Sequence, residues 1–152
     1  MEERSEVDHA VVKSVLIVAG IFLGTEIAVA AVSYLSGITL PSSVGVVVTV
    51  VSTMAGVRWF RHKYERPMSN PERLGFATGV TVVNCIIPAG LLSVLMAIAG
   101  LPINADSFDL VITGGHGYLF QPFVAWLALF ILGLVFLQAY FVAWFLTRER
   151  AR

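Results

Sequence analysis

The sequence predicts an all-α integral membrane protein: a four-helix bundle with both termini in the cytoplasm. Of its 152 residues, 57% are hydrophobic and 13% are charged, whereas an ordinary globular domain carries about 25% charged residues. Four tracts are apolar over about the 20 residues that a helix needs to cross a bilayer. All ten Lys and Arg residues lie outside these tracts. Residues 1–152 are therefore expected to form a single transmembrane domain.

The four spans are expected at about 14–35, 41–57, 74–101 and 123–146. Turn-forming residues at 36–43 separate the first two spans. Because no water is present in the hydrocarbon to pair with backbone groups, each span must be helical. A membrane β-barrel would instead show short strands of alternating hydrophobicity.

The positions of the basic residues predict the orientation, because Lys and Arg are retained on the cytoplasmic side. They precede the first span, lie in a cytoplasmic loop at 58–73 and follow the fourth span. The loop at 102–121, which is expected on the periplasmic side, contains no Lys or Arg. We therefore expect a multi-pass protein of the bacterial inner (cytoplasmic) membrane. The ten are Arg4, Lys13, Arg58, Arg61, Lys63, Arg66, Arg73, Arg148, Arg150 and Arg152.

A cleaved signal peptide is the alternative for the first span, because Ala28-Val29-Ala30 mimics a cleavage site. We disfavour it, because the preceding segment is acidic and the apolar tract continues to Leu35.

The end of loop 58–73 carries signals for the start of a helix. Asn70 is a possible cap, and Pro71 suits the first helical position. Ser69 with Glu72 also fits a capping box. The third span is thus expected to start here, with its first residue left open.

Three short stretches carry a resemblance to a known family: Leu40-Pro41-Ser42-Ser43, then Ala55-Gly56 with Phe60, then Arg66-Pro67 with Ser69, Glu72 and Arg73. Over roughly residues 35–80 the chain resembles a family of small four-helix bacterial inner-membrane proteins of unknown function. The resemblance implies a location and a topology. It implies no activity and no site.

Four polar residues are expected inside the spans: Glu26, Asn84, Thr49 and Thr53. At 1.5 Å per residue, Glu26 lies about 18 Å and Asn84 about 15 Å from the cytoplasmic edge. Pro88 has no amide proton, so the carbonyl of Asn84 lacks its helical donor. A protonated Glu26 could therefore donate a hydrogen bond to the side chain or the carbonyl of Asn84.

Glu26 gives two hypotheses for function. An acid at this depth is costly and usually faces a protein interior or a water-filled cavity. It could fix helix register in a non-catalytic protein with a helix-packing, accessory or assembly role, which we favour. The alternative is a small proton-coupled transporter that uses Glu26. Small multidrug transporters also have four helices and an acid in the first, but their dual topology requires a weak charge bias, unlike that seen here.

Small residues and basic residues predict the partners. Glycines such as Gly20 and Gly24 recur at helix-packing intervals, which suits packing within the chain or, alternatively, a homo-oligomer or a larger membrane complex. The basic residues of loop 58–73 are either a solvated connector or a clamp for anionic lipid headgroups, at about 1 kcal/mol per residue. These are Arg58, Arg61, Lys63, Arg66 and Arg73. The formal net charge of zero disfavours nucleic acid.

Motifs for catalysis or cofactors are not found. The sequence contains no nucleotide-binding glycine loop, nucleophile elbow or zinc-protease pair, so we expect neither an enzyme nor a cofactor. Its single cysteine, Cys85, is interpreted as a packing residue. Asp106, Asp109 and His116 share the second outer loop, but a lone histidine in a glycine-rich turn is a weak metal signal, and no metal site is expected.

Overall fold

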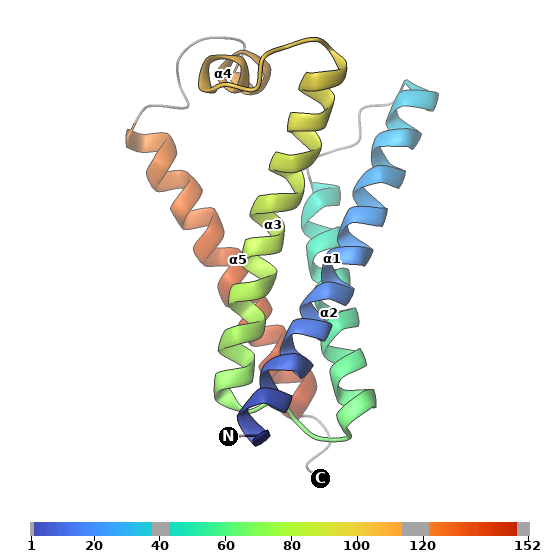
Figure 1. Cartoon of the computed structure of the whole chain (residues 1–152), viewed down its shortest axis with the longest axis vertical. Helices are drawn as coiled ribbons and strands as arrows, with labels where there is room; N and C mark the ends of the chain where they lie inside the picture. The colour runs from blue at the N-terminus through green and yellow to red at the C-terminus, as the bar shows by residue number, and fades with distance from the viewer. Residues whose placement is uncertain (1, 38–42, 114–121, 149–152) are drawn as a thin grey trace. The chain divides into compact units, whose positions relative to one another are not determined.

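A computed structural model describes residues 2–37, 43–113 and 122–148, and these residues form five helices and no strand (Figure 1). The helices are α1 (Glu2–Ser36), α2 (Ser43–Tyr64), α3 (Asn70–Ile98), α4 (Ala105–Thr113) and α5 (Pro122–Arg148). The all-α prediction is therefore confirmed.

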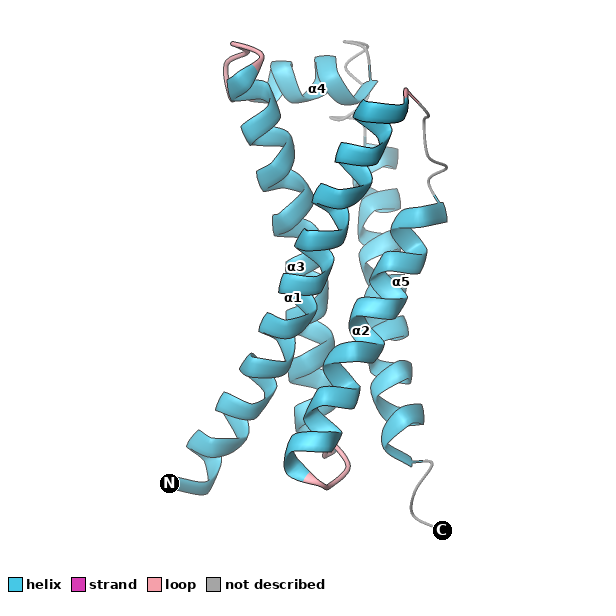
Figure 2. Ribbon diagram, turned by 90° about the vertical axis from the view of Figure 1, so that its right-hand side faces the viewer, coloured by secondary structure: helices cyan, strands magenta, loops and turns pink. Residues whose placement is uncertain are grey.

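Four of the helices are long and apolar enough to cross a membrane, over His9–Ser36, Val44–Tyr64, Asn70–Ile98 and Val124–Arg148. Each contains most of one predicted span, so the chain is a multi-pass membrane protein. Figure 2 shows each as an unbroken helix. Each helix extends past at least one end of its predicted span, most of all α1, which begins at Glu2 instead of 14. By contrast, α2 begins after the predicted 41 and α3 ends before the predicted 101.

The predicted cytoplasmic loop at 58–73 is largely helical. The α2 helix continues to Tyr64 and α3 begins at Asn70, so only residues 65–69 are non-helical. Charge ends the apolar tract after Val57, but no glycine or proline interrupts the chain before Pro67. Arg58, Arg61 and Lys63 thus lie on the last two turns of α2.

Glu65, the first residue after α2, has a left-handed conformation with a φ of 51°. Its amide donates to the carbonyl of Arg61 at 3.0 Å, which satisfies one of the carbonyls left unpaired at a helix end. Glycine is the usual residue at such a position, since it has no Cβ to clash. The chain therefore makes this turn with a strained residue.

The capping box predicted at the start of α3 is confirmed. The Ser69 amide donates to Glu72 Oε2 at 2.7 Å, as the third helical residue of a capping box accepts from the capping residue. Ser69 is therefore the cap, and Asn70 lies inside the helix.

The chain divides into two compact units, Met1–Asn84 with Val135–Arg152, and Cys85–Leu134. The first contains α1, α2, the beginning of α3 and the end of α5. The start of α1, the α2–α3 connection and the end of α5 meet at one end of this unit (Figure 1). Its core is made of buried residues from all four helices and the connection: Ala10, Val11, Val18, Val57, Phe60, Met68, Phe76, Ala77, Val80, Ala139 and Ala143.

Two glycines allow α1 to approach its neighbours closely. A Cβ on Gly56 would lie 2.5 Å from Val18 Cγ2 and 3.0 Å from the carbonyl oxygen of Ser14, and one on Gly79 would lie 2.6 Å from Val15 Cγ2. Glycine packing within the chain, as the sequence predicts, therefore occurs in α2 and α3. By contrast, a Cβ on Gly20 or Gly24 would meet nothing within 4 Å.

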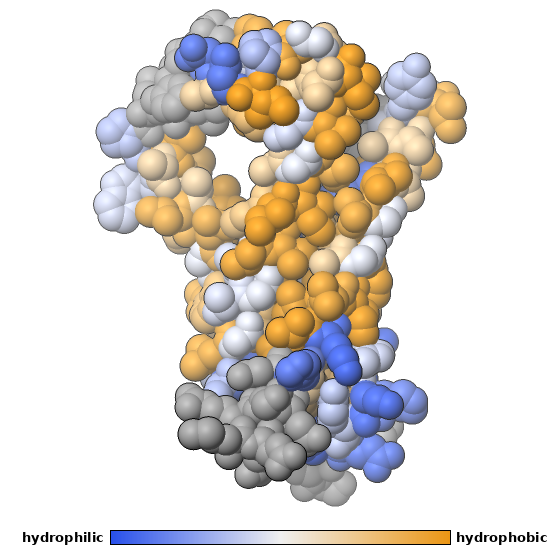
Figure 3. Space-filling view, in the orientation of Figure 1, coloured by the Kyte–Doolittle hydropathy of each residue, from blue (hydrophilic) through white to orange (hydrophobic). Residues whose placement is uncertain are grey.

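Most large apolar side chains of the long helices are exposed, as a hydrocarbon environment requires. Leu16, Val46 and Phe141 are each more than half exposed. Figure 3 shows hydrophobic side chains over the helices, with hydrophilic ones gathered at the end of the first unit where α2 ends.

The second unit contains a helix that the sequence analysis missed. The predicted periplasmic loop 102–121 includes α4, whose first turn is capped by Asn104 Oδ1 accepting from the Ser107 amide at 2.9 Å. The signal was present, since Asn104 is a good cap and Asp106 favours the positive end of the helix dipole. Ser107 and Asp109 are buried in this unit. His116 lies outside the described residues.

Candidate functional site

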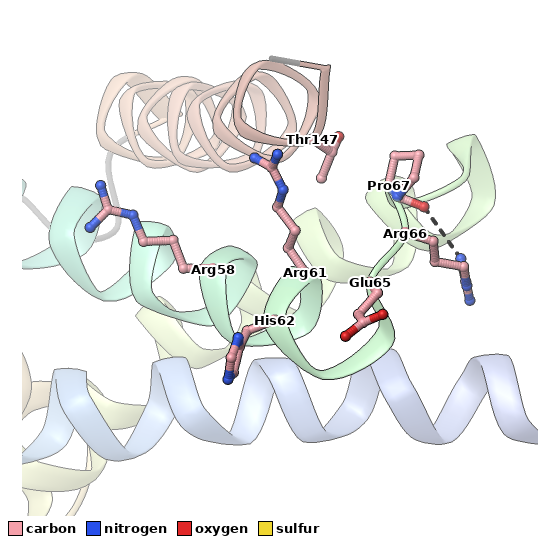
Figure 4. A pocket seen from close by; sticks show the side chains of 7 residues that line it. All are labelled: Arg58, Arg61, His62, Glu65, Arg66, Pro67 and Thr147. Atoms are coloured by element: carbon pink, nitrogen blue, oxygen red, sulfur yellow. Dashed lines mark hydrogen bonds between the residues drawn. The ribbon is translucent and has the colours of Figure 1, made fainter. Parts of the chain in front are cut away.

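A pocket of about 740 Å³ opens beside the last turns of α2. Its lining residues come from α2, the α2–α3 connection and the end of α5 (Figure 4). The continuation of α2 past Val57 places Arg58, Arg61 and His62 on the last two turns of the helix, and Figure 4 shows Arg61 and His62 pointing to opposite sides of it. The full set is Arg58, Arg61, His62, Glu65, Arg66, Pro67 and Thr147.

Arg61 connects α2 to the end of α5. Its Nη1 donates to the carbonyl oxygen of Leu146 at 2.5 Å, and Figure 4 shows the side chain reaching toward α5. The last four carbonyls of a helix lack intrahelical donors, and a cation there interacts favourably with the helix dipole. Arg61 therefore has a structural role as well as a place in the pocket.

Arg66 is held by Glu72 through two hydrogen bonds, Nη1 to Oε2 at 2.8 Å and Nη2 to Oε1 at 2.6 Å. Its guanidinium also lies 5.3 Å from the centroid of the Phe60 ring. The hydrogen bond to Glu72 raises the pKa of Arg66 above its usual value. The Glu72 side chain is fully buried, while that of Arg66 is 43% exposed. The charge of Arg66 is thus largely neutralised.

Arg58 is a cation of the pocket that no described residue pairs with. It is exposed, and it forms no hydrogen bond or ion pair with any residue that the structure describes. Its guanidinium donors are therefore not used by any residue that the structure describes. Of the predicted headgroup-binding residues, the structure brings Arg58, Arg61 and Arg66 together around this pocket.

The other two predicted residues lie elsewhere. Lys63 is exposed and does not line the pocket. Arg73 Nη1 donates to Asn70 Oδ1 at 3.2 Å, and its Nε is buried without a partner among the described residues. His62, Glu65 and Thr147 also line the pocket and were not predicted from the sequence. The helical spacing from Arg58 could have revealed His62, whereas no signal links Thr147 to residues so distant in sequence.

An apolar groove of about 420 Å³ has its lining residues on α2 and α5, which also contribute to the basic pocket. It too lies between α2 and α5. Met54 precedes Arg58 by one helical turn, and Leu146 is the neighbour of Thr147 in the chain. Its other lining residues are Phe141, Val142, Trp144 and Phe145. The Arg148 guanidinium lies 4.8 Å from the Trp144 ring centroid.

Three of the four polar residues predicted inside the spans, Thr49, Thr53 and Asn84, are connected by hydrogen bonds. Thr49 Oγ1 donates to Asn84 Oδ1 at 3.0 Å, and Asn84 Nδ2 donates to the carbonyl of Val80 at 2.9 Å. Thr53 donates to the carbonyl of Thr49 at 2.6 Å. This contact joins α2 to α3 through hydrogen bonds in the apolar part of the chain.

Glu26 does not join this group, so the expected hydrogen bond to Asn84 is not formed. Glu26 is partly buried and forms no hydrogen bond or ion pair with a described residue. The reason is that α1 has no fully buried residue after Phe22, one turn before Glu26. Asn84 is satisfied instead by the nearer Thr49.

The described residues contain no group of three or more His, Cys, Asp or Glu side chains that could hold a metal ion.

The fold and the pocket together define a class: an all-α, multi-pass membrane protein with a basic pocket at one end of a helical unit. No protein-family model, curated protein or solved structure matches the chain.

Proposed function

We propose that this chain is a non-catalytic protein of the bacterial inner membrane that has a helix-packing or assembly role, through a second copy or a larger membrane complex. Both termini then lie in the cytoplasm. The family resemblance over residues 35–80 agrees with this location and topology.

The distribution of basic residues supports the sidedness. Those with described side chains lie near the start of α1, the end of α2, the start of α3 and the end of α5, which meet at one end of the first unit (Figure 1). Basic residues are retained on the cytoplasmic side of a membrane. The residues are Lys13, Arg58, Arg61, Lys63, Arg66, Arg73 and Arg148.

The unpartnered part of α1 is the observation that carries the assembly role. After Phe22 this helix buries no residue fully, and Glu26 has no partner among the described residues. A charged group near the centre of a membrane helix costs about 2.5 to 3.5 kcal/mol on insertion scales. A hydrogen-bond donor on a neighbouring chain would offset that cost.

The glycines of α1 support the same conclusion. At about 100° per residue, Gly20 lies roughly 160° around the helix from Val18, which is buried against α2 and α3. Neither Gly20 nor Gly24 contacts anything that an added Cβ would meet within 4 Å. Small residues let membrane helices approach closely, so this face suits a second helix.

The test is the size of the protein purified in mild detergent, measured by light scattering with identification of co-purifying chains. We expect an assembly larger than one chain. The double variant Gly20→Leu with Gly24→Leu should reduce it to a monomer. Gly90→Leu is the matched control, since Gly90 is also an exposed glycine of a long helix with nothing within 4 Å. A monomeric wild-type protein without partners would contradict the proposal.

A small proton-coupled transporter is the second candidate, because an unpaired carboxyl inside a span is the group that such a mechanism needs. The Glu26→Gln variant separates the two. If the protein is a transporter, the variant loses the pH-coupled flux that the wild-type protein shows in proteoliposomes. If it has the assembly role, the wild-type protein shows no such flux, and the variant accumulates normally in the membrane. Flux in the wild-type protein that Glu26→Gln abolishes would refute the non-catalytic role.

A further inference from the structure

We propose that the space between α2 and the end of α5 binds one anionic phospholipid, with its phosphodiester in the basic pocket and an acyl chain along the apolar groove. The inference rests on the membrane location and sidedness proposed above, and it does not depend on the assembly role.

The basic pocket has free donors for the phosphodiester. Arg58 has no partner among the described residues, and Arg61 uses one guanidinium nitrogen for the Leu146 carbonyl. The remaining nitrogens of both residues can donate to phosphate oxygens, which the planar guanidinium binds in a bidentate manner. His62 also lines the pocket, although its side chain points away from Arg61 (Figure 4).

The charge of the pocket favours a phosphodiester over a free phosphate. Arg66 is neutralised by Glu72, and Glu65 offsets one of the two remaining arginines that line the pocket. Among the described acidic and arginine residues that line the pocket, the charge of one arginine therefore remains. A phosphodiester carries one negative charge and matches it, whereas inorganic phosphate near pH 7 is a mixture of the monoanion and the dianion and carries more than one negative charge on average.

The residues that line the apolar groove are near neighbours of the residues that line the basic pocket, on α2 and on α5. Met54 lies one turn before Arg58 on α2, and Leu146 precedes Thr147 on α5. Each of the two helices therefore contributes residues to both the basic pocket and the apolar groove. The groove is lined by side chains without charge. A soluble anion gains nothing from contact with an apolar surface, whereas an acyl chain buries its own apolar surface there.

Aromatic residues place the pocket at headgroup level. Trp59 follows Arg58 on α2, and Trp144 lines the groove on α5. Trp and Tyr are enriched where a membrane meets water. A phosphate bound by Arg58 and Arg61 would thus lie at its normal depth in the bilayer.

Trp144 provides a direct measurement, because it lines the groove. The protein is prepared with Trp144 as its single tryptophan, by Trp59→Phe and Trp126→Phe, and reconstituted in phosphatidylcholine vesicles. Phosphatidylglycerol or phosphatidylcholine with brominated acyl chains is then added at equal mole fractions. We expect brominated phosphatidylglycerol to quench Trp144 more strongly. Equal quenching by the two lipids would overturn the inference.

Arg58→Gln is the decisive variant, and Lys63→Gln is its matched control. Both residues are exposed cations on the last turns of α2, but only Arg58 lines the pocket. We expect Arg58→Gln to lower the preference for phosphatidylglycerol about fivefold, and Lys63→Gln to leave it unchanged. An equal decrease in both variants would indicate diffuse attraction to an anionic surface and would refute a defined site. Arg61→Gln is less informative, because it also removes the contact with α5.

Two further outcomes are decisive. Displacement of brominated phosphatidylglycerol by millimolar inorganic phosphate would show an anion site without lipid selectivity and would overturn the inference. Oligomeric state, measured on the same samples, separates this proposal from the proposed function. A monomer that keeps the lipid preference contradicts the assembly role alone, and an assembled protein without the preference contradicts the lipid site alone.

Discussion

Arg66 and Glu72 are joined by two hydrogen bonds of 2.8 and 2.6 Å that close the connection between α2 and α3. The same carboxylate accepts a third hydrogen bond from the Ser69 amide. One buried side chain therefore caps α3 and also holds the residue that follows the end of α2. The turn between the two helices depends on this carboxylate.

The two partners of this ion pair should have unequal effects when substituted. In Arg66→Gln the fully buried Glu72 loses its cation, and we expect a loss of about 3 kcal/mol in the free energy of unfolding. In Glu72→Gln the partly exposed Arg66 can turn to water, and we expect about 1 to 2 kcal/mol. Unfolding by SDS in mixed micelles, followed by circular dichroism, measures both. The explanation fails if Glu72→Gln is the more damaging change.

Gly56→Ala should destabilise the protein, because its Cβ would lie 2.5 Å from Val18 Cγ2 and 3.0 Å from the Ser14 carbonyl. Overpacking of this kind costs about 1 to 3 kcal/mol. Gly20→Ala is the control, since nothing lies within 4 Å of the position. The same unfolding assay applies. A stable Gly56→Ala protein would mean that α1 does not pack on α2 as described.

The hydrogen bond between Thr49 and Asn84 should be measurable as a coupling between α2 and α3. A double-mutant cycle with Thr49→Val and Asn84→Leu isolates it. We expect a coupling of about 0.6 kcal/mol, and at most about 1.7 kcal/mol, as for other membrane helices. Thr78→Val with Asn84→Leu is a control cycle, since Thr78 donates only to its own helix. Strictly additive effects for Thr49 and Asn84 would contradict the contact.

Glu65→Gly should stabilise the end of α2. A left-handed conformation costs an L-residue about 1 to 2 kcal/mol, while glycine adds about 0.5 to 1 kcal/mol of chain entropy to the unfolded state. We expect a net gain of up to about 1 kcal/mol in the unfolding assay. Glu65→Ala removes the same carboxylate without relieving the strain, so it should give no gain. If both variants are stabilised equally, the gain comes from charge and not from backbone conformation.

The sequence predicts the long helices well because hydrocarbon imposes one simple rule, that an apolar tract of sufficient length becomes a helix. That rule says where an apolar tract ends, but not where a helix ends. The residues Arg58 to Tyr64 therefore stayed helical although they were expected in a loop. The capping box at Ser69 and Glu72 was predictable because its signal is local.

The basic pocket was predictable only in part. Charge clustering identified Arg58, Arg61 and Arg66, which the pocket brings together. The contribution of Thr147 depends on how α5 packs against α2, and a single sequence contains no measure of that packing. The relation between Glu26 and Asn84 was also predictable only in part. Helix geometry gave their similar depth, but the sequence does not show where along its length α1 stops packing against its neighbours.

The contact between Arg61 and the Leu146 carbonyl has a consequence for biogenesis. The residues after Thr147 include neither glycine nor asparagine, so α5 has no local stop signal of the usual kind. Its final turn is completed by a donor from a helix that leaves the ribosome much earlier. When α5 enters the bilayer, the donor that completes its final turn is therefore already in place. In a chain that lacks Arg61, we expect proteolysis to begin at the frayed carboxyl-terminal turn of α5.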